Sequence, residues 1–139
     1  MTYGHAVRAQ LAEADLDDLP RNGPYVLGGI VNQGSSAGQL VRQLGVSKQA
    51  ASQLIDTLVL RGYLERQVDP EDRRRVKIEV TDRGRAAAAA VRAGVQAVDA
   101  ELAEMITPTE LAGLRAGLLA LCDIRDRMED EAQRDRVSS

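Results

Sequence analysis

The chain has 139 residues, a length that fits one domain, or one domain with a long appended element. Hydrophobic residues make up 44% and charged residues 28%, which excludes a chain that is disordered throughout. Cys122 is the single cysteine and His5 the single histidine, which excludes an internal disulfide and a metal site built on several Cys or His. The formal net charge is -3, and three tyrosines are the only aromatic residues, so the core must consist of Leu, Val, Ile and Ala, which suits packed helices.

Two helices are predicted before residue 34. Residues 6–16 are typical of a short amphipathic helix, and the Pro and Gly residues within 19–24 end it. An apolar face over 25–31 predicts the second helix. Gly28 and Gly29 lie inside it, where each weakens a helix by about 1 kcal/mol relative to Ala but would permit a close helix crossing.

Two short helices joined by a tight turn come next. The apolar spacing of residues 37–44 predicts a helix that Gly45 ends, and Ser47 is a good N-cap for a second helix that closes at Gly62. The inner face of this second helix is apolar, and its outer face is rich in amide and hydroxyl groups. This pattern is the sequence form of a helix-turn-helix, although any helical hairpin packed in a bundle would share it.

A β-hairpin is predicted directly after these helices. Residues 63–68 and 76–80 alternate apolar and polar side chains, as half-buried strands do, and the segment 69–75 between them is turn-forming and highly charged. A hairpin in this place is the wing of a winged helix. The predicted fold class is therefore mainly α with a small β-hairpin wing, a winged helix-turn-helix with a helical dimerisation region.

Two long helices are predicted at the C-terminal end of the chain. Thr81 begins the first, and a capping box at 107–110 begins the second, whose leucines recur at heptad-like steps suited to burial against a partner. Cys122 falls on this apolar side and is expected to be a small buried side chain. The charged tail 129–139 is expected to fray.

Charge is distributed unevenly along the chain. Residues 41–85 carry ten Lys and Arg against seven Asp and Glu, whereas both flanking segments are acidic. A basic middle between acidic flanks is typical of a phosphate-binding surface on a neutral scaffold, and ordinary charge scatter is the alternative.

Taken together, five motifs resemble the MarR family of bacterial transcription regulators. The joined pattern RGYLER, DPEDRR and VTDRG is specific, although each piece alone would be weak, and the resemblance covers roughly residues 20–105 by motif. The five motifs are Leu44–Ser47, Leu54–Leu58, Arg61–Arg66, Asp69–Arg74 and Val80–Gly84.

The resemblance implies a homodimer that binds a pseudo-palindromic operator in double-stranded DNA, usually as a repressor that small anionic or phenolic ligands or oxidants release. It implies an N-terminal dimerisation helix region at 1–24, a DNA-binding lobe at 25–85 and C-terminal helices at 86–139 that complete the dimerisation region. No cofactor and no metal are implied. Tyr25 would border an effector pocket or pack in the core.

The outer face of the second helix of the pair is expected to enter the major groove. Gln49 and Gln53 are four residues apart and project from one face, where a Gln amide pairs with adenine. Ser52 would reach a base or a phosphate, and Lys48 and Ser47 would reach phosphates. The alternative is that these side chains only solvate a surface helix.

The hairpin tip is expected to enter the minor groove. In related regulators an Asp-x-Arg of the wing pairs internally and points the arginine into that groove, which corresponds here to Asp72 and Arg74. Arg73 and Arg75 would then lie near phosphates. A solvated run of charge is the alternative.

Two rival classes of function are weaker. A winged-helix module for protein contacts alone would share the fold, but it would not explain the three arginines at the hairpin tip. An enzyme would need a phosphate loop, a nucleophile elbow or a metal-ligand cluster, and the sequence has none of these. With no signal-like N-terminus and no run of ~18 apolar residues, we expect a cytoplasmic protein without a membrane span.

Overall fold

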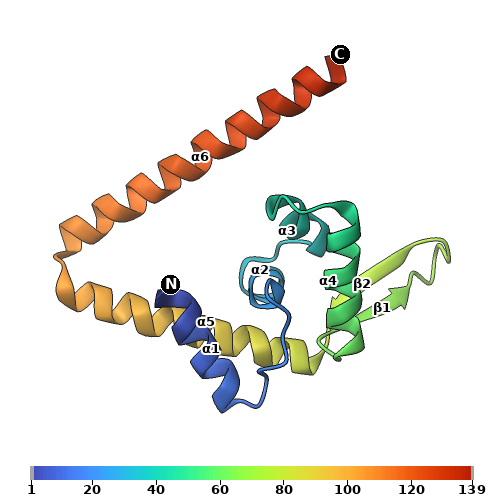
Figure 1. Cartoon of the computed structure of the whole chain (residues 1–139), viewed down its shortest axis with the longest axis horizontal. Helices are drawn as coiled ribbons and strands as arrows, with labels where there is room; N and C mark the ends of the chain where they lie inside the picture. The colour runs from blue at the N-terminus through green and yellow to red at the C-terminus, as the bar shows by residue number, and fades with distance from the viewer. Residues whose placement is uncertain (1, 139) are drawn as a thin grey trace. The chain divides into compact units, whose positions relative to one another are not determined.

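The computed structural model describes residues 2–138 and contains six helices and one hairpin within that range (Figure 1). In chain order these are α1 (Thr2–Glu13), α2 (Gly23–Gln33), α3 (Ala37–Gln43), α4 (Lys48–Leu60), β1 (Leu64–Val68), β2 (Val76–Val80), α5 (Asp82–Met105) and α6 (Pro108–Ser138). The predicted fold class, mainly helical with a small hairpin, is confirmed. The chain forms two compact units, one ending at Val98 and one beginning at Asp99, and each is described by itself.

The core of the first unit consists almost entirely of aliphatic side chains. Val26 and Leu27 of α2, Leu58 of α4 and Leu64 of β1 are fully or almost fully buried, together with Tyr63 just before β1. Burying a side chain of this size contributes about 1.5–3 kcal/mol relative to leaving it exposed. The core therefore joins the helix-turn-helix to the hairpin and to the helices that precede it.

Glycines bring the helices of this unit into close contact. A Cβ on Gly29 of α2 would lie 2.5 Å from a methyl carbon of Leu40 in α3, and a Cβ on Gly28 would lie 3.3 Å from Val91 of α5. The structure thus uses the two glycines for the close helix crossing that they would permit. A Cβ on Gly94 of α5 would lie 2.7 Å from the Cα of Val7, so α1 packs directly on the backbone of α5.

The hairpin is a two-stranded antiparallel sheet. Leu64 pairs with Val80 at its root and Val68 pairs with Val76 near its tip. Ile78 and Val80 pack against the core, whereas Val68 and Val76 are exposed. The root of the hairpin is thus part of the core and the tip extends into solvent.

The second unit contains the end of α5 and the whole of α6. As predicted, Thr107 and Glu110 form a capping box: the Glu110 N–H donates to Thr107 Oγ1 at 3.2 Å, and the Thr107 N–H donates to Glu110 Oε1 at 3.1 Å. The expectation that residues after 128 fray is wrong, because α6 continues to Ser138; Ser139 lies outside the described residues. An i,i+4 ion pair of 4.0 Å between Arg125 and Glu129 supports the helix there.

The described residues of α6 are all at least partly accessible, and none of them is buried. Cys122 is exposed, so the expected burial of its thiol is not found within one chain. Leu118, Leu119 and Leu121 of α6 are more than half exposed, and Leu114 is 44% exposed. Among residues 2–138, no helix has both the length and the apolar character that crossing a membrane requires.

Candidate nucleic-acid interface

The helix-turn-helix is formed by α3, a turn at Gly45 and α4. Gly45 has a φ of +66°, a left-handed conformation that suits glycine and that ends α3. Ser47 then caps α4, because its Oγ accepts a hydrogen bond from the Ala50 N–H at 3.1 Å. The predicted cap is confirmed.

A second cap in this motif is not among the sequence predictions. Ser36 and Gln39 form a full capping box at the start of α3, with bonds of 3.0 and 3.2 Å between side chains and backbone. The signal was present as Ser followed three residues later by Gln. This box begins the seven-residue helix α3 at a defined position before the turn.

The two faces of α4 separate as the sequence predicts. Leu58 is fully buried, and Leu54 and Ile55 pack against the core. The five side chains expected to contact DNA are exposed, and the structure brings them together on the first turns of one helix. They are Ser47, Lys48, Gln49, Ser52 and Gln53.

The three wing arginines are also exposed, at the tip of the hairpin. Arg73, Arg74 and Arg75 lie in the loop between β1 and β2. Their guanidinium groups carry three positive charges at the end of the hairpin, and the same loop carries the carboxylates of Asp69, Glu71 and Asp72. Such a tip is suited to the narrow, electronegative minor groove of A·T-rich DNA.

Asp72 organises this loop differently from the predicted pairing. Its Oδ1 accepts a hydrogen bond from the backbone N–H of Arg74 at 3.1 Å, and its Oδ2 lies 3.8 Å from Nε of Arg75. The side-chain partner of Asp72 is thus Arg75 and not Arg74. A carboxylate two residues before an N–H readily closes an Asx turn. Asp72 therefore holds the backbone of Arg74 and does not pair with the Arg74 guanidinium.

One ion pair joins α4 to the hairpin. Arg66 of β1 donates to the Asp56 carboxylate of α4. Both side chains are about half exposed, so the pair contributes about 0–1 kcal/mol to stability, and its effect is on the relative placement of the two elements.

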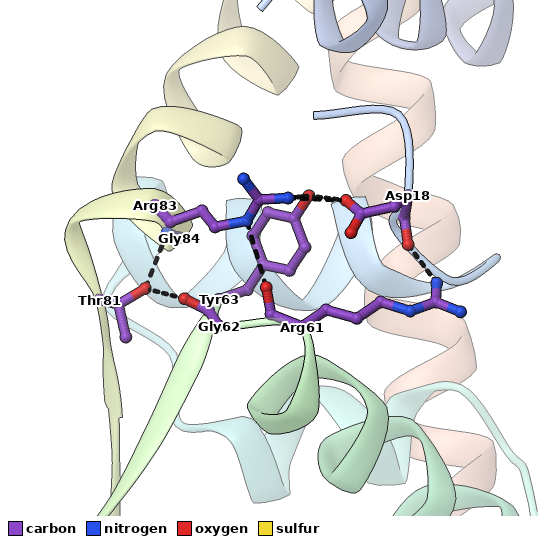
Figure 2. A network of polar contacts seen from close by, with 7 residues as sticks. All are labelled: Asp18, Arg61, Gly62, Tyr63, Thr81, Arg83 and Gly84. Carbon is purple, nitrogen blue, oxygen red and sulfur yellow. Dashed lines mark hydrogen bonds and ion pairs between the residues drawn. The ribbon is translucent and has the colours of Figure 1, made fainter. Parts of the chain in front are cut away.

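A network of polar contacts surrounds the junction of α4 and β1 (Figure 2). Arg61, at the end of α4, donates to the backbone carbonyl of Asp18, and the Tyr63 hydroxyl donates to the Asp18 carboxylate. Arg83 of α5 lies 3.0 Å from that carboxylate and 3.1 Å from the Tyr63 oxygen, with its guanidinium carbon 4.6 Å from the centre of the ring. Asp18 itself lies in the loop between α1 and α2.

The other side of the junction is fixed by Thr81 and Gly84. Thr81 Oγ1 donates to the carbonyl of Gly62 at 2.5 Å and accepts from the Gly84 N–H at 3.0 Å. A Cβ on Gly84 would lie only 2.2 Å from the carbonyl oxygen of Tyr63, so α5 begins in direct contact with the root of the wing.

The pKa values of two groups in this network are shifted. Burial, followed by the hydrogen bond to Asp18, raises the pKa of Tyr63 to about 12. The hydrogen bond from Tyr63, followed by the charge of Arg83, holds the pKa of Asp18 below its usual value, although burial opposes this. The network therefore favours a neutral tyrosine beside an ionised carboxylate.

A cleft of about 790 Å³ lies between α1, the following loop and α2. Its lining includes Leu11, Leu16, Tyr25 and the guanidinium-bearing Arg8 and Arg21. Tyr25 thus borders a cavity, and its hydroxyl also donates to Gln43 Oε1 at 2.8 Å. Among residues 2–138, no group of three His, Cys, Asp or Glu side chains is arranged to hold a metal ion.

Comparison with known proteins gives a consistent result for the fold. A family model described as MarR family matches residues 17–75. The crystal structure of a MarR family transcription regulator is 25% identical, with a TM-score of 0.70, over 93% of this chain and 83% of that one. The structure of Streptococcus pneumoniae FabT in complex with DNA has a TM-score of 0.71 over 90% of both chains at 19% identity, which shows the same fold.

A curated relative aligns with part of the chain. The LexA repressor of Deinococcus radiodurans is 37% identical over 93 residues, which are 60% of this chain and 42% of that protein. The chain therefore spans less than half of the length of this relative.

Proposed function

We propose that this chain is a transcription regulator of the MarR family, whose model matches residues 17–75, and that it binds DNA as a dimer, a repressor that a small ligand releases. The observation that carries the proposal is the joint exposure of an amide- and hydroxyl-rich face on α4 and of three arginines at the tip of the adjacent hairpin. A regulator of DNA needs both, since base edges are read by amides and hydroxyls, and phosphates and narrow grooves attract arginine.

In this proposal α4 lies in the major groove. Gln49 and Gln53 contact base edges, Ser52 contacts a base or phosphate, and Ser47 and Lys48 contact phosphates near the helix N-terminus. Ser47 keeps this ability while capping α4, because its oxygen accepts from Ala50 and its hydroxyl proton stays available.

The wing would follow the backbone into the adjacent minor groove. Asp72 holds the backbone of Arg74. The Arg74 side chain would enter the minor groove, and Arg73 and Arg75 would lie near phosphates. Arg75 also lies beside Asp72, at an ion-pair distance of 3.8 Å with its side chain 80% exposed. Because so exposed a pair is weak, a phosphate would compete for this arginine with little loss.

Dimerisation is proposed to use the terminal helices, residues 1–24 and 86–139, as the resemblance implies. In support, α6 presents apolar side chains at heptad-like steps that are exposed in the single chain: Leu114, Leu118, Leu121 and Met128. A two-fold axis would place two recognition helices about 34 Å apart, one turn of DNA, and would match a pseudo-palindromic operator.

Release by a ligand is proposed to use the cleft beside α1. Its volume suits a small molecule and its lining is mostly apolar. Arg8 and Arg21 outnumber the one lining carboxylate, Asp17, and would favour an anionic group. Titration of the protein–DNA complex with salicylate-like aromatic acids would test this part separately.

Selection of bound sequences from a random duplex pool tests the proposed function. We expect a motif with two related half-sites, bound with an affinity that falls as salt rises. A winged-helix module for protein contacts alone would show essentially no affinity for random duplex DNA even at low salt, and that result would contradict the proposal.

A further inference from the structure

The loop between α1 and α2 holds Asp18 in a defined position. Leu16 is buried and its N–H donates to the Leu11 carbonyl at 2.8 Å, while Leu19 packs against the core on the other side of Asp18. Asp15 before it adopts a φ of +56°, a left-handed conformation that ends α1. Core contacts of the residues on both sides of Asp18 therefore hold the backbone at this position.

Asp18 contacts both sides of the turn at which α4 passes into the wing. Arg61 donates to its carbonyl oxygen and Tyr63 donates to its carboxylate, and these two residues flank Gly62. Gly62 has a φ of +82°, which turns the chain from helix to strand. Arg83 of α5 binds the same carboxylate at 3.0 Å, so Tyr63 and Arg83 converge on the Asp18 side chain, while Arg61 contacts its backbone (Figure 2).

The angle at this turn determines where the wing tip lies relative to the recognition helix. A strand of five residues extends about 16 Å at roughly 3.3 Å per residue, so a tilt of about 10° at the root displaces the tip by roughly 3 Å. That displacement is as large as a hydrogen-bond length, so the helix and the wing could no longer meet their grooves together.

We propose that Asp18 is a positioning residue for DNA binding, which holds the wing at the correct angle to the recognition helix although it belongs to neither element. The inference rests on the proposed function. Asp18 and Arg83 are nearly half exposed, so their ion pair adds little to overall stability. Loss of the Asp18 side chain should therefore weaken DNA binding much more than it weakens folding.

Asp17 provides a matched control. It is the acidic neighbour of Asp18 in the same loop and is exposed, so Asp17→Ala and Asp18→Ala remove the same charge. Removal of a negative charge alone makes DNA binding equal or tighter, because the protein then repels phosphate less. The role proposed for Asp18 predicts the opposite sign for its own variant.

The full-length variants are compared on the duplex selected with the wild type, at one fixed salt concentration. We expect Asp18→Ala to bind at least about tenfold more weakly than Asp17→Ala while both remain folded by circular dichroism. Tyr63→Phe, which changes no charge, should shift affinity in the same direction and gives an independent route if Asp18→Ala does not fold.

Hydrogen exchange without DNA separates this inference from the proposed function. The Tyr63 N–H donates to the Leu58 carbonyl at 2.9 Å and the Thr81 N–H donates to the Tyr63 carbonyl at 3.2 Å, so both amides report on the wing root. Both should exchange faster in Asp18→Ala than in Asp17→Ala. Wild-type protein that binds no duplex would contradict the proposed function, whereas equal affinities or equal exchange of the two variants would overturn the role of Asp18.

Discussion

The hydroxyl of Tyr63 donates a hydrogen bond to the carboxylate of Asp18 across 45 residues of sequence. Tyr63 is fully buried at the root of the wing, and Asp18 lies in the loop that follows α1. The guanidinium of Arg83 lies beside the Asp18 carboxylate and over the Tyr63 ring. The wing root is thus tied to the N-terminal part of the chain through side chains as well as through the backbone.

Alkaline pH should reveal this contact in the stability of the protein. The pKa of Tyr63 rises from 10.0 to about 12 on folding, so the folded state holds the phenolic proton more tightly. The resulting stabilisation is complete below pH 10 and is lost as pH rises from about 10 through about 12. Urea unfolding at several pH values should therefore show a steeper loss for the wild type than for Tyr63→Phe. Parallel curves over this range would contradict a Tyr63 hydroxyl that is both buried and hydrogen-bonded to Asp18.

Two glycines should respond in opposite directions to alanine. At Gly84 a Cβ would meet the backbone of Tyr63 at 2.2 Å, so Gly84→Ala should lower the free energy of unfolding by about 1–3 kcal/mol through overpacking. At Gly113 in α6 a Cβ would meet nothing within 4 Å, so Gly113→Ala should raise helix stability by up to about 1 kcal/mol. Thermal unfolding measures both, and a neutral Gly84→Ala would show that α5 does not begin against the wing root.

The elements of the fold could be predicted because their signals are local. Ser47 caps α4 and Thr107 caps α6 through groups three residues away, and the alternation of 63–68 and 76–80 marks the hairpin directly. Exposure of the outer face of α4 follows from the same helical period.

The Asp18 network could not be predicted in this way. Its bonds join residues 43, 45 and 65 positions apart, and only the packing of α1, α4 and α5 brings them together. The sequence motif does not predict the partners of Asp72 either. The conformation of the turn presents the backbone N–H of Arg74 and the side chain of Arg75 to the same carboxylate. The charged composition after residue 128 also predicts fraying, whereas α6 continues to Ser138 and one ion pair, between Arg125 and Glu129, spans the start of this segment.

Gln53 should set the preference for one base position. Gln53→Ala removes an exposed amide from the outer face of α4, so affinity for the selected duplex should fall by about 1–3 kcal/mol and preference at one base pair should relax. Gln33→Ala at the end of α2 removes the same exposed group outside α4, the hairpin and the terminal helices, and should leave both unchanged. Repeating the duplex selection with each variant provides the measurement, and an unaltered motif for Gln53→Ala would remove this residue from base recognition.

Arg74 should contribute to affinity through the phosphate region. Arg74→Ala should weaken binding to the operator by about 1 kcal/mol or more and should flatten the dependence of affinity on salt, because fewer counterions are released. Arg85→Ala, at an exposed arginine outside α4 and the hairpin tip, makes the same change in charge and serves as the control. If a salt titration gives the same slope and affinity for both variants, the wing takes no part in binding.

Two neighbouring leucines of α6 test the dimer. Leu118 lies on the heptad seam with Leu114 and Leu121, whereas Leu119 lies about 100° away around the helix, and both are more than half exposed in the single chain. Each seam leucine buried in a dimer would stabilise it by about 1.5–3 kcal/mol per copy, and an aspartate there would be buried without a partner. Leu118→Asp should therefore yield monomers by light scattering at micromolar concentration and lose operator binding, while Leu119→Asp stays dimeric. Dimers for both variants would place the interface on another face, and monomers for the wild type would remove the two-fold arrangement from which the spacing of the recognition helices follows.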